Sequence, residues 1–171
     1  MALETYKEKR NFENTPEPEA MVEGEREKLI FVVQRHQASH LHFDFRLEAD
    51  GVLKSWAVPK GPSMNAKDKR LAVMVEDHPL EYARFEGNIP EGNYGAGIVE
   101  IWDSGTWKPK KGFENIEESL KKGQLEFFLE GEKLKGEFIL ISIGSTTKNG
   151  WLLRKRTDKF ATKKNYDANE V

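Results

Sequence analysis

The chain has 171 residues, of which 37% are hydrophobic, and this size fits one domain with a single packed core. The sequence has no cysteine, which excludes disulfides and thiolate metal sites, and a net charge of −2, which argues against coating nucleic acid through bulk positive charge. No apolar run approaches the roughly 18 residues of a membrane span, and the N-terminus has no secretory apolar region. We therefore expect a soluble, cytoplasmic protein without a membrane partner.

In chain order, residues 1–28 are polar and acidic and predict a short helix over residues 2–10 followed by an extended arm. The apolar run at residues 29–33 predicts a buried strand. Glycine and asparagine turns separate further strand-like runs at residues 54–58, 70–75, 98–102, 124–129, 137–143 and 151–154.

One helix is expected in the body, over residues 116–122, with Asn115 at its N-terminus and Gly123 at its end. Many short strands with little helix indicate a mainly β protein, either an antiparallel barrel or a sandwich. We expect an N-terminal arm over residues 1–28, a body over residues 29–157, and a loose polar tail over residues 158–171.

Residues 40–48 alternate polar and apolar side chains without a break. Because a strand directs alternate side chains to opposite faces, its apolar residues are expected to face the core: Leu41, Phe43, Phe45 and Leu47. The other face is expected to point outward with a polar set: His40, His42, Asp44, Arg46 and Glu48. Two histidines, an aspartate and an arginine in register are unusual on a solvated strand.

His42 and Asp44 are two residues apart, so imidazole and carboxylate can converge on one ion from the same strand face. His36 follows the first expected strand and can supply a third ligand across the intervening turn. Two imidazoles and one carboxylate leave coordination positions for water or substrate, as a catalytic metal site requires. Arg46, next on the face, offers a planar fork suited to a phosphate.

A lone His-x-Asp pair is more often a surface hydrogen bond, but His36, Arg46 and His78 together favour a functional site. His40 is expected to be a solvated neighbour, and Tyr82 alone is typical of a core or rim aromatic. The glycines of residues 92–97 fit a phosphate cradle or a tight turn equally well. Core positions are expected for all four tryptophans: Trp56, Trp102, Trp107 and Trp151.

Six motifs stand out along the chain: FVVQRH at residues 31–36, LHFDFRLE at 41–48, KSWAVPKGP at 54–62, VEDHP at 75–79, FEG at 85–87 and IPEGNYGAG at 89–97. They resemble the 3′-phosphoesterase domain of bacterial ATP-dependent DNA ligase D, from Lys9 to about Arg156. That family occurs both fused to ligase and polymerase domains and free-standing, and this length resembles the free-standing form.

The resemblance implies an antiparallel β-barrel with one or two short helices and an active site on one side. It implies a manganese-dependent hydrolase, both phosphodiesterase and phosphomonoesterase, which removes a 3′-terminal ribonucleoside and then the 3′-phosphate to leave a 3′-hydroxyl. The implied substrates are 3′ ends of DNA primer-templates in break repair by non-homologous end joining. The implied partners are DNA ligase, repair polymerase and Ku.

The resemblance also implies residue roles. The metal ligands would be His36, His42 and Asp44. The scissile phosphate would be held by Arg46, His78 and Tyr82, with Gln34 nearby and Lys60 and Arg70 as further basic contributors. In the arm, Arg10 and Glu17 match a family motif whose arginine and acidic residues serve activity. Asn11 stands where the family usually has aspartate.

The residues alone leave several alternatives open. Zinc, iron(II) and manganese all accept this ligand set. His78 can donate a proton to the leaving oxygen or only hydrogen-bond the phosphate. His42-x-Asp44 with His78 also matches the facial triad of iron(II) oxygenases, which is the alternative enzyme. A non-catalytic module that binds DNA ends is the third hypothesis.

Overall fold

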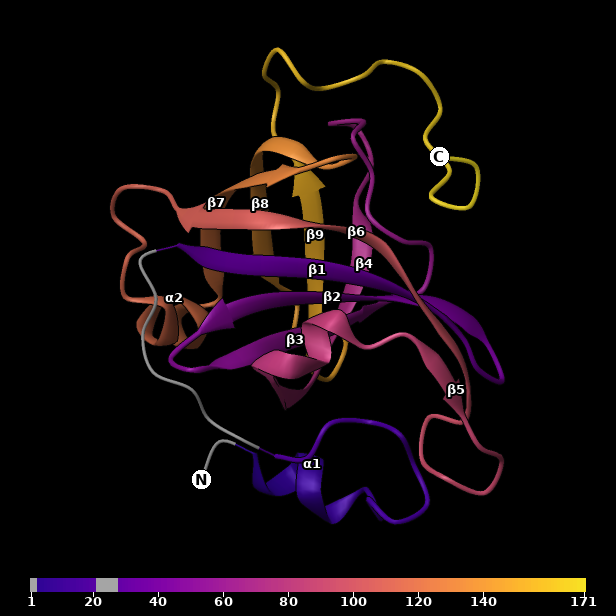
Figure 1. Cartoon of the computed structure of the whole chain (residues 1–171). Helices are drawn as coiled ribbons and strands as arrows, with labels where there is room; N and C mark the ends of the chain where they lie inside the picture. Colours follow the sequence, from indigo (N-terminus) through magenta and orange to yellow (C-terminus); the bar gives the residue numbers. More distant parts are fainter. Residues whose placement is uncertain (1–2, 21–27) are drawn as a thin grey trace.

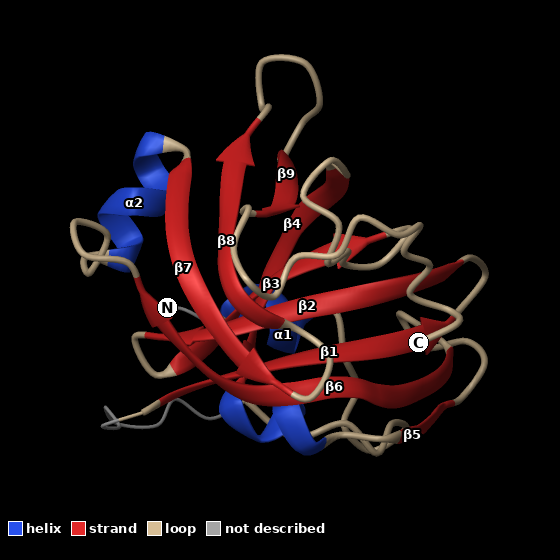
Figure 2. Ribbon diagram, turned by 90° about the horizontal axis from the view of Figure 1, so that it is seen from above, coloured by secondary structure: helices blue, strands red, loops and turns tan. Residues whose placement is uncertain are grey.

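The computed structural model describes residues 3–20 and 28–171, which build a closed antiparallel β-barrel (Figure 1, Figure 2). In the described residues, eight strands close the ring in the order β1-β2-β3-β4-β9-β8-β7-β6, with β6 pairing back to β1, and the short β5 pairs with the start of β6. The strand bounds are β1 Leu29–Gln37, β2 Leu41–Ala49, β3 Val52–Val58, β4 Arg70–Pro79, β5 Gly87–Ile89, β6 Gly97–Pro109, β7 Gln124–Gly131, β8 Lys135–Ser142 and β9 Gly150–Lys155.

The α-helices of the described residues are α1, Glu4–Glu8, and α2, Ile116–Lys122, and a 3₁₀ helix, η1, spans Leu80–Arg84. The predicted capping of α2 is confirmed. The Asn115 side chain accepts a hydrogen bond from the Glu118 N–H, and Gly123 ends the helix in the left-handed region at φ 84°. Within these described residues, no helix is both long and apolar enough to cross a membrane.

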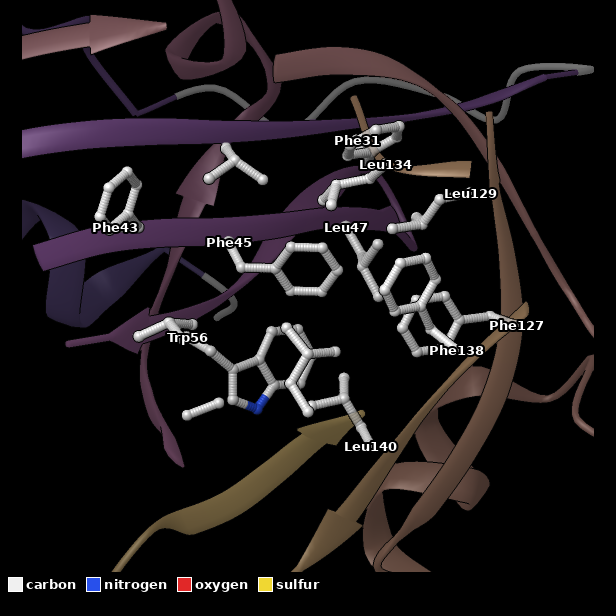
Figure 3. Close-up of a cluster of buried hydrophobic side chains, with 14 of the residues drawn as sticks. Phe31, Phe43, Phe45, Leu47, Trp56, Phe127, Leu129, Leu134, Phe138 and Leu140 are labelled. Atoms are coloured by element: carbon white, nitrogen blue, oxygen red, sulfur yellow. The ribbon is translucent and has the colours of Figure 1, made fainter. Parts of the chain in front are cut away.

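The barrel interior is filled by apolar side chains that alternate along the strands, as the period-two pattern predicted (Figure 3). Phe43, Phe45 and Leu47 of β2 are fully buried there, whereas Leu41, the first residue of the strand, is only half-buried. The tryptophan prediction is confirmed, because all four indoles belong to this core. The core consequently packs against one face of β2 and leaves the other face to polar side chains.

Strands β1, β4 and β6 continue well beyond their predicted ends. The apolar run predicted a first strand that ends at residue 33, with His36 beyond the strand and beside the turn, and this is wrong. β1 runs on to Gln37, and His36 pairs across the sheet with His42 of β2 and with Val99 of β6. Similarly, His78 lies inside β4, opposite Leu53 of β3, rather than after it. The extensions consist largely of polar residues, so a search for apolar runs does not detect them. A strand can continue through such residues because its hydrogen bonds join backbone groups and need no apolar side chain.

Residues 3–20 and the C-terminal tail both pack against the barrel, and they lie on opposite sides of it in Figure 1. Tyr6 of α1 is fully buried among residues of β1, β3 and η1. The tail also packs, contrary to the expectation that it is loose. The Trp102 Nε1–H donates to the Ala168 carbonyl at 2.8 Å, and Ala168 itself is buried against the core. The boundaries of arm, body and tail stay a proposal.

Candidate active site and metal centre

The register of β1 against β2 assembles the predicted metal ligands on one face. His36 pairs with His42, and Gln34 pairs with Asp44. The His36 Nδ1 lies 3.4 Å from one carboxylate oxygen of Asp44, and the His42 Nε2 lies 3.3 Å from the other. The potential ligand atoms of these three residues all lie within 4.8 Å of one another. Two imidazoles and a carboxylate fit a divalent transition metal.

Backbone carbonyls orient both imidazoles. The His36 Nε2–H donates to the Gly95 carbonyl at 2.7 Å, which leaves Nδ1 free to face Asp44. The His42 Nδ1–H donates to the His40 carbonyl at 3.1 Å, which leaves Nε2 free in turn. Such second contacts are typical of metal-binding histidines, because they select the tautomer and aim the ring. His40 itself is exposed, as predicted.

Asp44 keeps its negative charge inside the protein. Burial on its own would raise the pKa of Asp44, but the Arg46 guanidinium, with the His36 and His42 rings beside the carboxylate, outweighs burial and holds that pKa well below its usual range. Burial opposes the charged form of His42, yet contact with Asp44 raises the pKa of His42 overall. Asp44 therefore offers a charged oxygen ligand with an imidazole nitrogen on either side of it.

Arg46 is held rigidly next to this cluster. Its Nε donates to the Gln34 side chain at 2.8 Å, and Gln34 in turn donates to the carbonyls of Tyr82 and Phe85 at 2.7 and 3.1 Å. The guanidinium also lies over the Tyr82 ring, 4.8 Å from its centre. Arg46 is only 3% exposed, and among the described residues its buried Nη1 has no hydrogen-bond partner. A buried donor of this kind is costly unless a ligand satisfies it.

His78 of β4 is fully buried beside Arg46 and Arg10. Its Nδ1–H donates to the Glu76 carbonyl at 2.9 Å, so its Nε2 accepts from Arg10 Nη2 at 3.3 Å. Burial, together with the charges of Arg46 and Arg10, lowers the pKa of His78 well below its ordinary value. The ring is therefore neutral in this arrangement.

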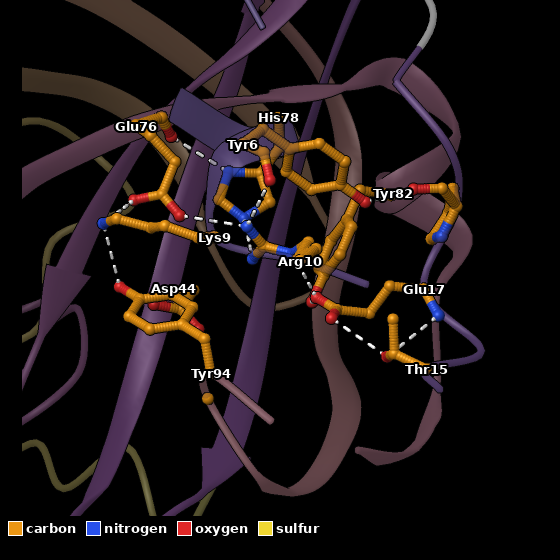
Figure 4. Close-up of polar contacts among 12 residues, drawn as sticks. Tyr6, Lys9, Arg10, Thr15, Glu17, Asp44, Glu76, His78, Tyr82 and Tyr94 are labelled. Atoms are coloured by element: carbon orange, nitrogen blue, oxygen red, sulfur yellow. Dashed lines mark hydrogen bonds and ion pairs between the residues drawn. The ribbon is translucent and has the colours of Figure 1, made fainter. Parts of the chain in front are cut away.

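The N-terminal arm closes over the polar face (Figure 4). The Arg10 Nε donates to Glu17 at 2.9 Å, and its Nη1 donates to Glu76 at 3.2 Å. The Tyr82 hydroxyl donates to the same oxygen of Glu17 at 2.6 Å, and Thr15 donates to the other oxygen at 3.0 Å. Burial, with Glu17 beside the phenol, raises the pKa of Tyr82, so the phenol stays protonated.

The expectation that the polar face of β2 points to solvent is therefore wrong. Asp44, Arg46 and Glu48 are all buried, because the arm, α1 and η1 cover that face. A cleft of about 270 Å³ remains, lined by most of the predicted site residues: Arg10, Glu17, His36, His42, Asp44, Arg46, His78 and Tyr82.

Lys60 and Arg70 do not line this cleft. Lys60 is exposed just after β3. Arg70 donates to Asp68 at 3.2 Å and to the Tyr166 carbonyl at 2.6 Å, which ties down the C-terminal tail. That Lys60 and Arg70 contribute to nucleic-acid binding stays a proposal. They could contact only parts of a substrate that lie outside the cleft.

Three cleft-side residues were missed by the sequence analysis: Tyr6, Glu76 and Tyr94. Glu76 carries the clearest signal, because it lies two residues before His78 and so shares its strand face. Its carboxylate binds Arg10 and also Lys9, at 3.0 Å. Tyr6 stands four residues before Arg10, and its ring packs 5.1 Å from the His78 ring. Tyr94 lies in the glycine-rich segment after β5, which proves to be a turn.

Comparison with known proteins identifies the family. A family model described as the DNA ligase D 3′-phosphoesterase domain matches residues 34–142. The chain belongs to this family. It is 52% identical over 159 residues to a multifunctional non-homologous end joining protein, LigD, of Pseudomonas aeruginosa. It is 42% identical over 165 residues to the protein of that name in Mycolicibacterium smegmatis, and 44% over 156 residues to the corresponding DNA repair protein of Mycobacterium tuberculosis.

These alignments cover 90–92% of this chain but only 19–21% of the relatives. The chain thus spans about a fifth of the length of the LigD proteins that it matches. The shared region is the phosphoesterase domain, and membership implies a hydrolase that acts on phosphoesters.

Proposed function

We propose that this ligase D phosphoesterase processes the 3′ ends of DNA strands for non-homologous end joining, in the presence of manganese. It would remove a 3′-terminal ribonucleoside and then the remaining 3′-phosphate, leaving a 3′-hydroxyl. The observation that supports this best concerns Arg46, which lines the cleft of the His36–His42–Asp44 cluster and whose buried Nη1 has no hydrogen-bond partner among the described residues. A phosphate oxygen beside the cluster would satisfy that donor.

The described side chains divide the work between them. His36, His42 and Asp44 would hold a divalent cation, which would supply Lewis-acid polarisation of the phosphate. Arg46, which is buried beside the cluster, would neutralise charge on the other phosphate oxygens. Gln34 keeps the guanidinium in place through the carbonyls of η1.

The protonation state of His78 is expected to depend on whether a phosphate is bound. In the structure its Nε2 accepts a hydrogen bond from Arg10, and its ring is neutral. A phosphate dianion bound beside Nε2 favours the imidazolium, because an opposite charge stabilises the charged form. The protonated Nε2 then gives up the hydrogen bond from Arg10, donates one to the phosphate instead, and has a proton to give to the leaving oxygen.

The arm is proposed to serve the diesterase step, which must place a ribonucleoside beyond the phosphate. Arg10 and Glu17 cover one side of the cleft, where Arg10 contacts His78 and Glu17 contacts Tyr82. The exposed Asn11 side chain accepts a hydrogen bond from the Glu13 N–H at 3.1 Å. Because its amide is uncharged, Asn11 adds no charge to this side of the cleft. DNA ligase, repair polymerase and Ku are proposed as partners because the relatives are named as end joining proteins.

The oxygenase alternative required His78 as the third ligand. Within the described residues, the group that can hold a metal contains His36 instead, and His78 is bonded to Arg10 and Glu76. That ligand set and the family assignment both favour the hydrolase. A non-catalytic module that binds DNA ends would use the same contacts without hydrolysing the phosphoester. Only an activity assay therefore separates it from the hydrolase.

The test is release of phosphate from a primer-template with a 3′-phosphate, with manganese, zinc, iron(II) or a chelator. We expect release with manganese and none with chelator. His42→Ala should abolish release, while the matched His40→Ala, at an exposed position of the same segment, should behave as wild type. Release that survives chelation or the loss of His42 would contradict the site. Binding without any release would support the non-catalytic module.

The arm is tested by point variants, because deletion of residues 1–20 would also expose the cluster around buried Tyr6. Arg10→Gln should slow removal of a terminal ribonucleoside more than removal of a 3′-phosphate. Asn11→Asp should leave ribonucleoside removal unchanged or improve it. Equal losses on both substrates would show that the arm serves the common centre or stability.

A further inference from the structure

Tyr94 is an exposed aromatic side chain at the mouth of the candidate active site. It is 48% exposed, and of the exposed large apolar side chains in the described part of the chain, it alone lines the cleft that holds the metal ligands. No aromatic ring of those described residues packs against it. The barrel therefore gains little stability from this ring.

The chain nevertheless holds Tyr94 in a defined position. It lies in a double turn between β5 and β6, in which Asn93 N–H donates to the Pro90 carbonyl and Ala96 N–H donates to the Asn93 carbonyl. Gly95 follows at φ 74°, a conformation that favours glycine, and its carbonyl accepts the His36 Nε2–H at 2.7 Å. The turn that presents the ring is thus bonded to a metal ligand.

Cations of the arm approach the same ring (Figure 4). The Lys9 Nζ lies 4.5 Å from the ring centre and 3.3 Å from the hydroxyl, and the Arg10 guanidinium lies 5.5 Å from the ring centre. An exposed aromatic beside paired cations is the arrangement by which proteins hold single nucleotides: the ring stacks on a base, and the cations follow the phosphates.

We propose that Tyr94 forms a stacking subsite for the base of the nucleotide whose 3′ oxygen carries the scissile phosphate. The inference rests on the proposed function, since the phosphate must lie between Arg46 and the metal ligands. Stacking uses the face of a base and reads no hydrogen-bond pattern, so the subsite accepts all four bases. It distinguishes a nucleic-acid end from a phosphoester that has no base.

The test compares two primer-templates that both end in a 3′-phosphate, one with a normal terminal nucleotide and one with an abasic terminal residue. Tyr94→Ala should raise KM about tenfold for the normal end, leave kcat unchanged, and have no effect on the abasic end. Tyr94→Phe, which keeps the ring but loses the hydroxyl contact with Lys9, should behave as wild type. Phe160→Ala, at an exposed aromatic outside the cleft, is the matched control and should change neither constant.

Three results would overturn the subsite. Equal effects of Tyr94→Ala on both ends would mean that the base is not contacted. A fall in kcat alone would mean that the turn only positions His36, and a loss in Tyr94→Phe equal to that in Tyr94→Ala would assign the effect to the hydroxyl. If the wild-type protein releases phosphate from neither end, the proposed function fails, and the subsite fails with it.

Discussion

The two faces of β2 are both buried, but different interactions compensate for the lost water. On the inner face, Phe43, Phe45 and Leu47 pack in the barrel core. On the outer face, Asp44 and Arg46 are buried under the arm and η1, where charge pairs and hydrogen bonds replace solvent. The inner face is complete as it stands, whereas the outer face keeps an unpartnered Arg46 donor within the described structure.

This difference separates stability from chemistry on a single strand. Apolar packing is non-directional, so the inner face needs only volume and shape. The outer face needs direction, because each carboxylate and guanidinium must meet specific atoms. Substitutions on the inner face should therefore affect mainly unfolding, and those on the outer face mainly activity.

The largest effect is expected for Asp44→Asn on the outer face. This change keeps the volume but removes the charge that holds His36, His42 and a cation together. Manganese-dependent phosphate release should fall at least about a thousandfold, with weaker metal binding by calorimetry. A variant that binds manganese as tightly as wild type would show that the cluster is not the metal centre.

The inner-face counterpart is Phe45→Ala. Loss of a fully buried phenyl ring leaves a cavity and should lower the free energy of unfolding by about 3–5 kcal/mol, measured in urea. The molecules that stay folded should keep near-normal phosphate release. A large loss of activity per folded molecule would break the division between the two faces. Phe160→Ala, at a 42% exposed position, is the control and should change stability by less than about 0.5 kcal/mol.

A somewhat smaller loss of activity is expected for Arg46→Lys. Lysine keeps the charge but loses the planar fork that binds both Gln34 and a phosphate oxygen. Phosphate release should fall about a hundredfold or more, while the urea midpoint changes far less than in Phe45→Ala. Normal rates in the lysine variant would reduce Arg46 to a general electrostatic contributor.

The smallest effect concerns pH and the buried His78 next to the outer face. Its pKa is lowered in the folded protein, so below the ordinary histidine value of about 6.5 the unfolded chain binds a proton that the folded protein does not. The free energy of unfolding should therefore fall with decreasing pH, approaching about 1.4 kcal/mol per pH unit for this one group.

His78→Gln should make this slope shallower between about pH 5 and 6.5, measured by urea unfolding. The exposed His40→Gln is the control and should leave the slope unchanged. An unchanged slope in His78→Gln would mean that His78 takes up its proton in the folded state as it does in the unfolded state. His42, whose pKa is raised, acts in the opposite direction and mainly above this window, where its stabilisation is lost as pH rises.

Much of the site could be predicted from the sequence because its residues follow one short periodic strand. Alternation over residues 40–48 placed His42, Asp44 and Arg46 on one face, and the barrel register confirms that placement. His36 was assigned to the right cluster for the wrong reason, since it lies in β1 directly opposite His42 and not beyond the strand. Local pattern identifies a face, but only strand pairing decides which residue of another strand lies opposite.

The sequence by itself determined which strand residues form the core, the capped helix α2 and the ligand types, because periodicity, capping and donor chemistry are local properties. Only the tertiary structure decided that the polar face is buried, that Glu17 joins Arg10 to Tyr82, and that Gln34 fixes Arg46. These contacts connect residues up to 65 positions apart. Their partners are selected by how the arm and η1 fold onto the barrel, and a polar, charged composition looks the same whether a segment is solvated or closes over a site.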